Sequence, residues 1–179
     1  MSKKILVLSA SARVMGNSDL LADEFIRGAQ ESGHEVEKVQ VSRLNIKGCL
    51  GCDACQKNVG VCVQQDDAIA IMKKMNEAHV IVMASPVYFY HVNAQLKALW
   101  DRTYSQITTW RDKTVYFITA GAAPNASYFD HIVKGVEHYV GCFENVRLAG
   151  TVLGLGAMGK GQVKDSEAMQ QAYLMGRNA

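Results

Sequence analysis

The sequence predicts an α/β fold in which helices cover both faces of a doubly wound, five-stranded parallel sheet of order 2-1-3-4-5. Apolar segments of strand length alternate with segments of helical period along the chain, which is typical of βαβ units. The 179 residues, 49% of them hydrophobic, suffice for one well-buried core. We therefore expect residues 1–179 to form a single domain built around one sheet.

The predicted strands are short runs of aliphatic and β-branched residues. They span residues 4–9, 35–41, 79–85, 114–120 and 147–155. The central three are the most continuously apolar, so we expect them to be buried on both faces.

The segments between these strands carry apolar residues at helical spacing. Five amphipathic stripes predict helices: Leu21, Phe25 and Ala29; Ala68, Ile71, Met72 and Met75; Leu96, Leu99, Trp100 and Tyr104; Ile132, Val136 and Val140; and the segment 165–177. Ser18 and Asp19 before the first helix, and Asp66 and Asp67 before the second, are candidate caps or first-turn acids. Gly33 is the expected stop of the first helix.

Charge and hydropathy exclude several classes of partner. Lys plus Arg number 19 against 17 Asp plus Glu, a net charge of +2 that is too small for a nucleic-acid groove. The apolar stretch 5–8 is shorter than the core of a secretory signal, and no segment is long enough for a membrane helix. We expect a cytoplasmic protein with reduced thiols and no nucleic-acid or membrane partner.

The loop after the first strand, "SASARVMGNSDLL", predicts an anion site. Hydroxyl and amide side chains precede a helix whose first N–H groups are free to bind an anion. The candidate residues are Ser9, Ser11, Arg13, Asn17 and Ser18. Neither G-x-x-x-x-G-K-[ST] nor G-x-G-x-x-G is present, so a single phosphate fits best. An ordinary strand-to-helix turn, capped by Asn17 and Ser18, is the alternative.

Two further loops meet the same edge of the predicted sheet. After the third strand, Pro86 is followed by Tyr88, Phe89 and Tyr90, an aromatic loop tip that suits a flat ligand or a subunit interface. After the fourth, Gly121 lies among small residues and can bring backbone close to a ligand. Together the three loops predict a site for a phosphorylated planar cofactor.

Two of these segments resemble known signatures. "LVLSASARVMGNSDLL" resembles LVxxGSPRxxGNTxxL, and "SPVYFYHVNAQLKALWDRT" resembles SPVYFxxxxxxLKxxxDR, the FMN-binding signatures of the NAD(P)H-dependent FMN reductase family, which has a flavodoxin-like fold. Residues 139–161 resemble the family's last strand and loop. Ala10 and Ala12 depart from the family's glycine and proline, and Ala10 requires a negative φ.

The resemblance implies FMN as cofactor, NAD(P)H as electron donor and a homodimer or homotetramer. It implies that Ser11, Arg13, Asn17 and Ser18 hold the FMN phosphate. It also implies contacts to the flavin ring from Pro86, Val87, Tyr88 and Phe89 on one side and from Thr119, Ala120 and Gly121 on the other. Exposed aromatics at Tyr88–Tyr90 and Trp110 would bring subunits together near the site.

The segment "GCLGCDACQKNVGVC" contains four of the five cysteines. Cys49, Cys52, Cys55 and Cys62 follow C-x2-C-x2-C-x6-C, a compact spacing closer to iron–sulfur sites than to paired zinc knuckles. The segment resembles the iron–sulfur flavoprotein subgroup, which implies a [4Fe–4S] cluster. Reduced or redox-active thiols are the alternative, and a structural disulfide is disfavoured in a cytosolic protein. Cys142 is expected to be a packed thiol.

These observations predict an enzyme: an FMN-dependent NAD(P)H oxidoreductase with a second acceptor. The acceptor would be the cluster, a redox protein, or a quinone, nitro or azo compound. The cofactor carries the chemistry, so no catalytic residue is assigned; His91 is expected at the rim, and Asp101 beside Arg102 or a neighbouring chain. The alternatives are a flavodoxin-like electron carrier without turnover, which the slightly basic charge disfavours, and a cysteine-based redox sensor.

Overall fold

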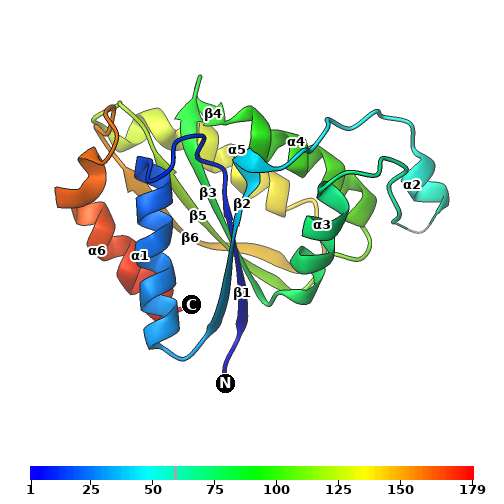
Figure 1. The fold of residues 1–179 in the computed structure, drawn as a ribbon, viewed down its shortest axis with the longest axis horizontal. Helices are drawn as coiled ribbons and strands as arrows, with labels where there is room; N and C mark the ends of the chain where they lie inside the picture. Colours follow the sequence, from blue (N-terminus) through cyan, green and yellow to red (C-terminus); the bar gives the residue numbers. More distant parts are fainter. Residues whose placement is uncertain (59) are drawn as a thin grey trace.

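The computed structural model describes residues 1–58 and 60–179, and its centre is one sheet of order β2-β1-β3-β5-β6 (Figure 1). The strands are β1 (Lys4–Ser9), β2 (Glu35–Gln40), β3 (Val80–Tyr88), β4 (His91–Val92), β5 (Lys113–Ala120) and β6 (Val146–Gly154). All long strands are parallel, and only the short β4 pairs antiparallel, with β3. The predicted order 2-1-3-4-5 is confirmed.

Helices cover both faces of this sheet (Figure 1). One face packs against α1 (Asn17–Glu31) and α6 (Glu167–Arg177), and the other against α3 (Ala68–Glu77), α4 (Ala94–Arg102) and α5 (Asp130–Val140). Short 3₁₀ turns follow β2 and α4 and precede α5 and α6, at Val41–Arg43, Thr103–Gln106, Ala126–Phe129 and Gln162–Asp165. Within the described residues, no helix combines the length and apolar character needed to cross a membrane.

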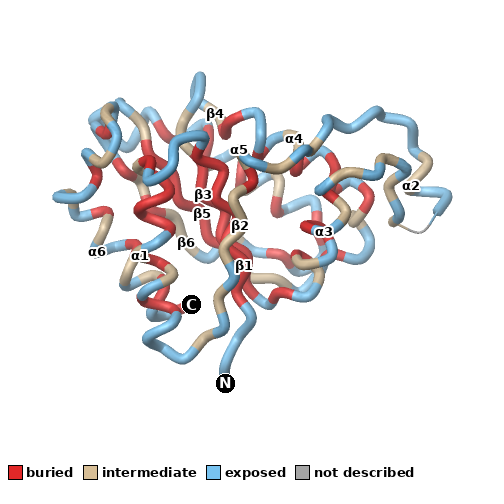
Figure 2. Tube along the Cα trace, in the orientation of Figure 1, coloured by how far each residue is buried: buried red, intermediate tan, exposed pale blue. Residues whose placement is uncertain are grey.

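Burial follows the order of the strands in the sheet (Figure 2). β1, β3 and β5 are buried over most of their length, whereas the edge strand β2 is only half-buried. Central parallel strands are covered by helices on both faces, so nearly every side chain in them meets apolar neighbours. The expectation of three doubly buried strands is confirmed.

Two elements were not predicted from the sequence. β4 returns the chain after an aromatic turn, and α2 (Ala54–Lys57) is a single turn inside the cysteine segment. Both are too short to give a periodic signal. The first helix already begins at Asn17, so Ser18 and Asp19 lie in its first turn rather than before it.

Three expectations about single residues were wrong. Trp110 is buried, with its ring edge-on to Phe143 at a centroid distance of 4.3 Å, because the chain after α4 folds back onto α5. Cys142 is exposed in the turn after α5. Arg102 is buried and pairs with Asp66 at 2.6 Å instead of Asp101, which pairs with Lys97 at 2.6 Å. Contact of Asp101 with a neighbouring chain stays a prediction.

Candidate functional site

The loop between β1 and α1 is held in one shape by its own polar groups. The Ser11 hydroxyl donates to the Arg13 carbonyl oxygen at 2.8 Å, and the Gly16 N–H donates to the same oxygen at 3.0 Å. A Cβ at Gly16 would lie 2.4 Å from the Ser11 Oγ, so a larger residue there would displace the Ser11 hydroxyl from its bond to Arg13. Ala10 has no positive φ, as expected, and the loop tolerates alanine there.

Asp19, in the first turn of α1, connects this loop to the sheet through hydrogen bonds. Its carboxylate accepts hydrogen bonds from the Ser9 hydroxyl at 2.6 Å, the Gln40 amide at 2.8 Å and the Met15 N–H at 3.1 Å, and it pairs with Lys38 at 2.7 Å. Burial alone would raise the pKa of Asp19, but the bonds from Lys38, Ser9 and Gln40 hold that pKa below its usual value. A buried carboxylate therefore joins the loop to β1 and β2.

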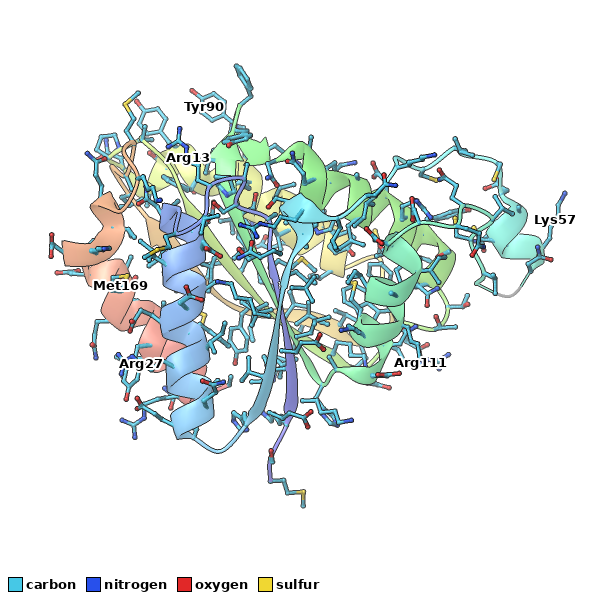
Figure 3. The ribbon with its side chains drawn as sticks, viewed as in Figure 1. Arg13, Arg27, Lys57, Tyr90, Arg111 and Met169 are labelled. Carbon is cyan, nitrogen blue, oxygen red and sulfur yellow. The ribbon has the colours of Figure 1, made fainter. Side chains whose placement is uncertain are left out.

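The N-terminus of α1 presents an unused hydroxyl. Ser18 is buried, and its Oγ has no hydrogen-bond partner among the described residues. A buried hydroxyl without a partner costs free energy unless a ligand satisfies it. Arg13 is exposed above the same loop (Figure 3), so its guanidinium is free to meet an anion. The residue types fit a phosphate group at a helix N-terminus.

The hairpin of β3 and β4 forms the opposite wall. Phe89 and Tyr90 occupy its turn with φ values of 48° and 65°, a left-handed conformation that costs bulky side chains free energy. Phe89 is fully exposed, and Tyr90 lies edge-on to His131 at 6.2 Å. In Figure 3 Tyr90 projects beyond the end of the sheet. The turn thus holds aromatic rings in solvent beside the loop after β1.

Between these walls lies a cleft of about 170 Å³ at the carboxyl ends of the strands. It is lined by Ser11, Arg13, Gly16, Asn17, Ser18, Pro86, Val87, Tyr88, Ala120, Gly121, Ala122, Ala157 and Met158. Nine of the twelve expected residues, Ala120 among them, therefore line this cleft. Gly121 comes close to β3, where an added Cβ would lie 3.2 Å from the Val87 side chain.

Three expected residues do not line this cleft. Ser9 is turned toward Asp19, Thr119 is buried within the sheet, and Phe89 faces a separate shallow hollow with Tyr90 and His131. In the strands, successive side chains alternate between the two faces of the sheet, so neighbours in the signature cannot all face the ligand. The loop after β6, which supplies Ala157 and Met158, was not expected in the site.

Asn17 connects this last loop to α1. Its side-chain amide donates to the carbonyl oxygens of Ala157 at 3.0 Å and Gly159 at 2.8 Å, and its oxygen accepts from the Val163 N–H at 3.4 Å. Both ends of the side chain are thereby occupied. Asn17 shapes the cleft by holding the loop after β6 against the N-terminus of α1.

The cysteine segment projects from the far end of the molecule, beyond α3 and α4 (Figure 1). Cys49, Cys52, Cys55 and Cys62 line one small cavity, and all four are free thiols. In the described part of the chain, no three Cys, His, Asp or Glu side chains are already gathered as a metal site. Binding of a metal group would require the cysteine side chains to move toward one another.

Arg102 forms the inner wall of this cavity. Its side chain is fully buried and donates to the Lys47 carbonyl oxygen at 3.0 Å and the Gln64 carbonyl oxygen at 3.1 Å, in addition to Asp66. Burial opposes its charge, yet Asp66 and the Cys62 thiol raise the pKa of the guanidinium. Breaking a buried ion pair such as Arg102–Asp66 costs about 3–5 kcal/mol, so the guanidinium is held firmly in place. Its bonds to the Lys47 and Gln64 carbonyl oxygens then anchor both ends of the cysteine segment.

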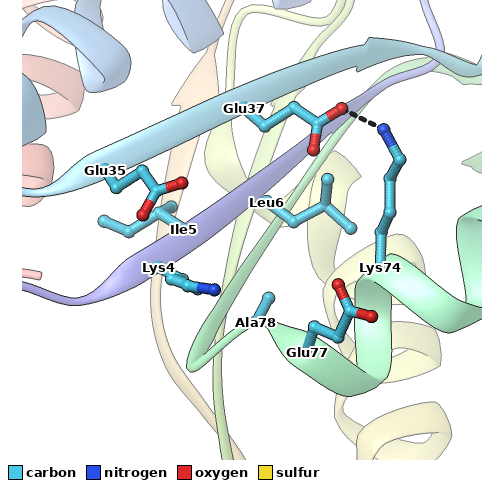
Figure 4. Close-up of a pocket in the computed structure, with 8 residues that line it drawn as sticks. All are labelled: Lys4, Ile5, Leu6, Glu35, Glu37, Lys74, Glu77 and Ala78. Carbon is cyan, nitrogen blue, oxygen red and sulfur yellow. Dashed lines mark hydrogen bonds and ion pairs between the residues drawn. The ribbon is translucent and has the colours of Figure 1, made fainter.

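A second polar hollow, of about 100 Å³, lies at the opposite edge of the sheet (Figure 4). It is lined by the starts of β1 and β2 and the end of α3, where Lys74 pairs with Glu37 across it. Ligands of doubly wound sheets bind beyond the carboxyl ends of the strands. We therefore assign the functional site to the cleft beside the loop after β1.

The fold and this cleft define the class of doubly wound α/β proteins with a cleft at the switch point between β1 and β3. Within that class, the chain belongs to the NADPH-dependent FMN reductase family, whose model matches residues 3–130.

Comparisons with individual proteins agree with this assignment. The chain is 42% identical over 100 residues to an iron-sulfur flavoprotein from Methanocaldococcus jannaschii, a match covering 56% of the chain and 51% of that relative. The chain thus spans about half the length of the curated relatives it matches first. Among solved structures it resembles RosB with bound 8-demethyl-8-formylriboflavin-5'-phosphate (TM-score 0.77, 17% identity, 98% of this chain and 76% of that chain). It also resembles the NAD(P)H:quinone oxidoreductase from Methanothermobacter marburgensis (TM-score 0.75, 16% identity, 99% and 96%). At these identities the structural likeness shows the fold.

Proposed function

We propose that the protein is an FMN-dependent NAD(P)H oxidoreductase that passes electrons from a nicotinamide to a second acceptor. The observation that carries this proposal is the buried Ser18 hydroxyl at the N-terminus of α1. It has no hydrogen-bond partner within residues 1–58 and 60–179, and it borders a cleft that Val87 and Tyr88 also line. A phosphate would satisfy this hydroxyl, and a flat ring would cover the wall beyond it. Family membership and the flavin derivative bound to RosB support the same ligand.

Different residues of the cleft would bind the phosphate and the ring of FMN. Arg13 and Ser18 would meet the phosphate with a positive charge and a hydroxyl. Ser11 would add a second hydroxyl once that group turned from the Arg13 carbonyl oxygen toward the phosphate. Pro86, Val87 and Tyr88 would support one side of the ring, and the backbone at Ala120 and Gly121 would approach the other. FMN held there supplies the redox chemistry, accepting hydride from a nicotinamide and releasing its electrons to an acceptor. The chain itself supplies position and electrostatics.

Two kinds of acceptor are proposed. The four cysteines would hold a [4Fe–4S] cluster as thiolates, which the iron-sulfur flavoprotein relatives support. A small quinone, nitro or azo compound is the other kind, supported by the quinone oxidoreductase with the same fold. The exposed rings of Tyr88, Phe89 and Tyr90 support assembly as a homodimer or homotetramer, which light scattering would measure.

The first experiment is an anaerobic absorption spectrum with flavin, iron and acid-labile sulfide quantified on the same sample. One flavin per chain, with NADPH oxidation in the presence of a quinone, is the expected result. Iron and sulfide near four per chain would add the cluster. Protein that neither contains flavin nor binds added FMN would refute the proposal.

The variant Ser18→Ala tests the carrying observation. The wild-type hydroxyl has no partner in the part of the chain that the structure describes, so its removal should leave the stability of the apoprotein unchanged or slightly higher. The dissociation constant for FMN should rise about tenfold, the loss of one hydrogen bond to a charged group. Equal FMN affinity in both proteins would mean that the phosphate binds elsewhere.

A redox-sensor role for the cysteines is kept as a second candidate because all four thiols are free and two are exposed. In that case peroxide should consume free thiols and change the assembly state, whereas NADPH oxidation should not depend on the cysteines. The variant Cys55→Ser distinguishes a cluster-binding role of the cysteines from a redox-sensor role. It should abolish iron binding if the cluster exists and leave flavin content intact in either case.

A further inference from the structure

We propose that Arg102 is the charge-compensating residue of the cysteine site, holding its Nε–H for the Cys62 sulfur when the cysteines bind a metal group as thiolates. This inference rests on the metal-binding part of the proposed function. Arg102 was singled out only as the end of the second sequence signature, and it lies outside the residues that line the flavin cleft. Its surroundings point to the cysteine segment instead.

The Arg102 guanidinium has unused hydrogen-bonding capacity. Two guanidinium nitrogens are engaged: Nη1 donates to Asp66 and the Lys47 carbonyl oxygen, and Nη2 donates to the Gln64 carbonyl oxygen. The Nε is buried and has no partner among the described residues. Three of the five N–H donors of the guanidinium thus have acceptors among the described residues. A buried donor such as the Nε–H stays unsatisfied only at a free-energy cost, so this N–H is available for an acceptor.

Cysteine sulfurs are the candidate acceptors for the Nε–H of Arg102. The cavity beside the guanidinium is lined by all four cysteines, and proximity to Cys62, after that of Asp66, helps to raise the pKa of Arg102. A neutral thiol is a weak acceptor, whereas a metal-bound thiolate is a strong one. The donor is therefore matched to the state of Cys62 in which its sulfur carries negative charge.

The negative charge of metal-bound thiolates favours a cation beside them. Four thiolates around a divalent metal carry a net charge of −2, and a cluster with four thiolate ligands is also anionic. Asp66 bonds to the guanidinium through Nη1, and the same guanidinium bonds to the carbonyl oxygens of Lys47 and Gln64, at the two ends of the cysteine segment. A buried cation that also closes the segment would both gather the ligands and offset their charge.

The test uses Co²⁺ alone, titrated into reduced, metal-free protein and followed by the thiolate-to-cobalt charge-transfer absorption. The variants are Arg102→Lys, which keeps the charge but loses the fork of donors, and Arg102→Gln, which loses both. Lys57→Gln is the matched control, because it removes one positive charge from the same segment at an exposed position. We expect about tenfold weaker Co²⁺ binding in Arg102→Gln, an intermediate loss in Arg102→Lys and less than about twofold in Lys57→Gln.

A double-mutant cycle keeps the proposal testable should Arg102→Gln fail to fold. The losses in Co²⁺ affinity caused by Arg102→Lys and Cys62→Ser should not add, because both remove the same contact. Additive losses, or unchanged affinity in a folded Arg102→Gln protein, would overturn the proposal. So would wild-type protein that binds no Co²⁺. Flavin binding is measured separately, so a protein without flavin that still shows the Arg102 effect refutes only the flavoenzyme assignment.

Discussion

The substitution Asp19→Asn tests how the loop after β1 is held. The carboxylate of Asp19 accepts bonds from Ser9, Gln40, Lys38 and the Met15 N–H. An asparagine at position 19 keeps the size of the side chain and one acceptor oxygen. Its NH₂ group replaces the other oxygen and faces groups that are themselves donors. Bonds to charged groups contribute about 1.5–3 kcal/mol, and Lys38 retains a second partner in Asp23. We therefore expect the free energy of unfolding to fall by about 2–3 kcal/mol.

The same substitution should weaken FMN binding about tenfold, because the Met15 N–H no longer fixes the loop. Urea unfolding and flavin fluorescence measure the two effects. Asp23→Asn is the control: its half-exposed carboxylate also pairs with Lys38, at 2.5 Å, and should matter by less than about 0.5 kcal/mol. Equal stability of the two variants would refute the reasoning.

The effect of Asp19 should also depend on pH. Folding lowers the pKa of this carboxyl, so its contribution to stability is complete above about pH 4, where the unfolded group is ionised. The contribution is lost as the pH falls through the lower pKa of the folded state. The stability difference between wild type and Asp19→Asn should therefore be constant around neutral pH and shrink in acid below about pH 4. A difference that grows in acid would show that the carboxylate is not the stabilising form.

Three further substitutions follow from the packing and the loops. Gly176→Ala should cost more than about 2 kcal/mol in chemical unfolding, since its Cβ would lie 2.0 Å from the Phe25 carbonyl oxygen, whereas Gly48→Ala meets open space and should cost far less; equal losses would contradict the close packing of α1 on α6. Phe89→Gly should stabilise the protein by about 1 kcal/mol by relieving a positive φ at an exposed residue, and it should leave FMN affinity within about twofold; a loss of stability would mean that the ring makes contacts in solution. Asn17→Ala should speed amide exchange in residues 157–163 of the apoprotein, because three hydrogen bonds to that loop are removed, and unchanged exchange would argue against this role.

The sequence also misled at identifiable points. The signatures suggested that Phe89 contacts the cofactor, but Phe89 is fully exposed and lines a separate hollow, whereas Asn17 lines the cleft and also bonds to the loop after β6. Trp110 was expected to be exposed, although Tyr139 and Phe143 pack against its ring and bury it. Tyr139 and Phe143 lie far along the chain from Trp110, and a local pattern holds no information about them.

The alternation of strands and helices, the burial of the central three strands and the position of the polar loop after β1 were determined by the sequence alone. They depend on apolar periodicity and on which residues follow each strand, and both are local properties. The strand order followed from this alternation because 2-1-3-4-5 is a common order of doubly wound sheets. The tertiary structure decided which side chains face the cleft, that the loop after β6 completes it, and that Arg102 turns toward Asp66 and the cysteines. Those outcomes depend on contacts between residues such as Asp66 and Arg102, 36 positions apart, whose geometry exists only after helices and strands have packed.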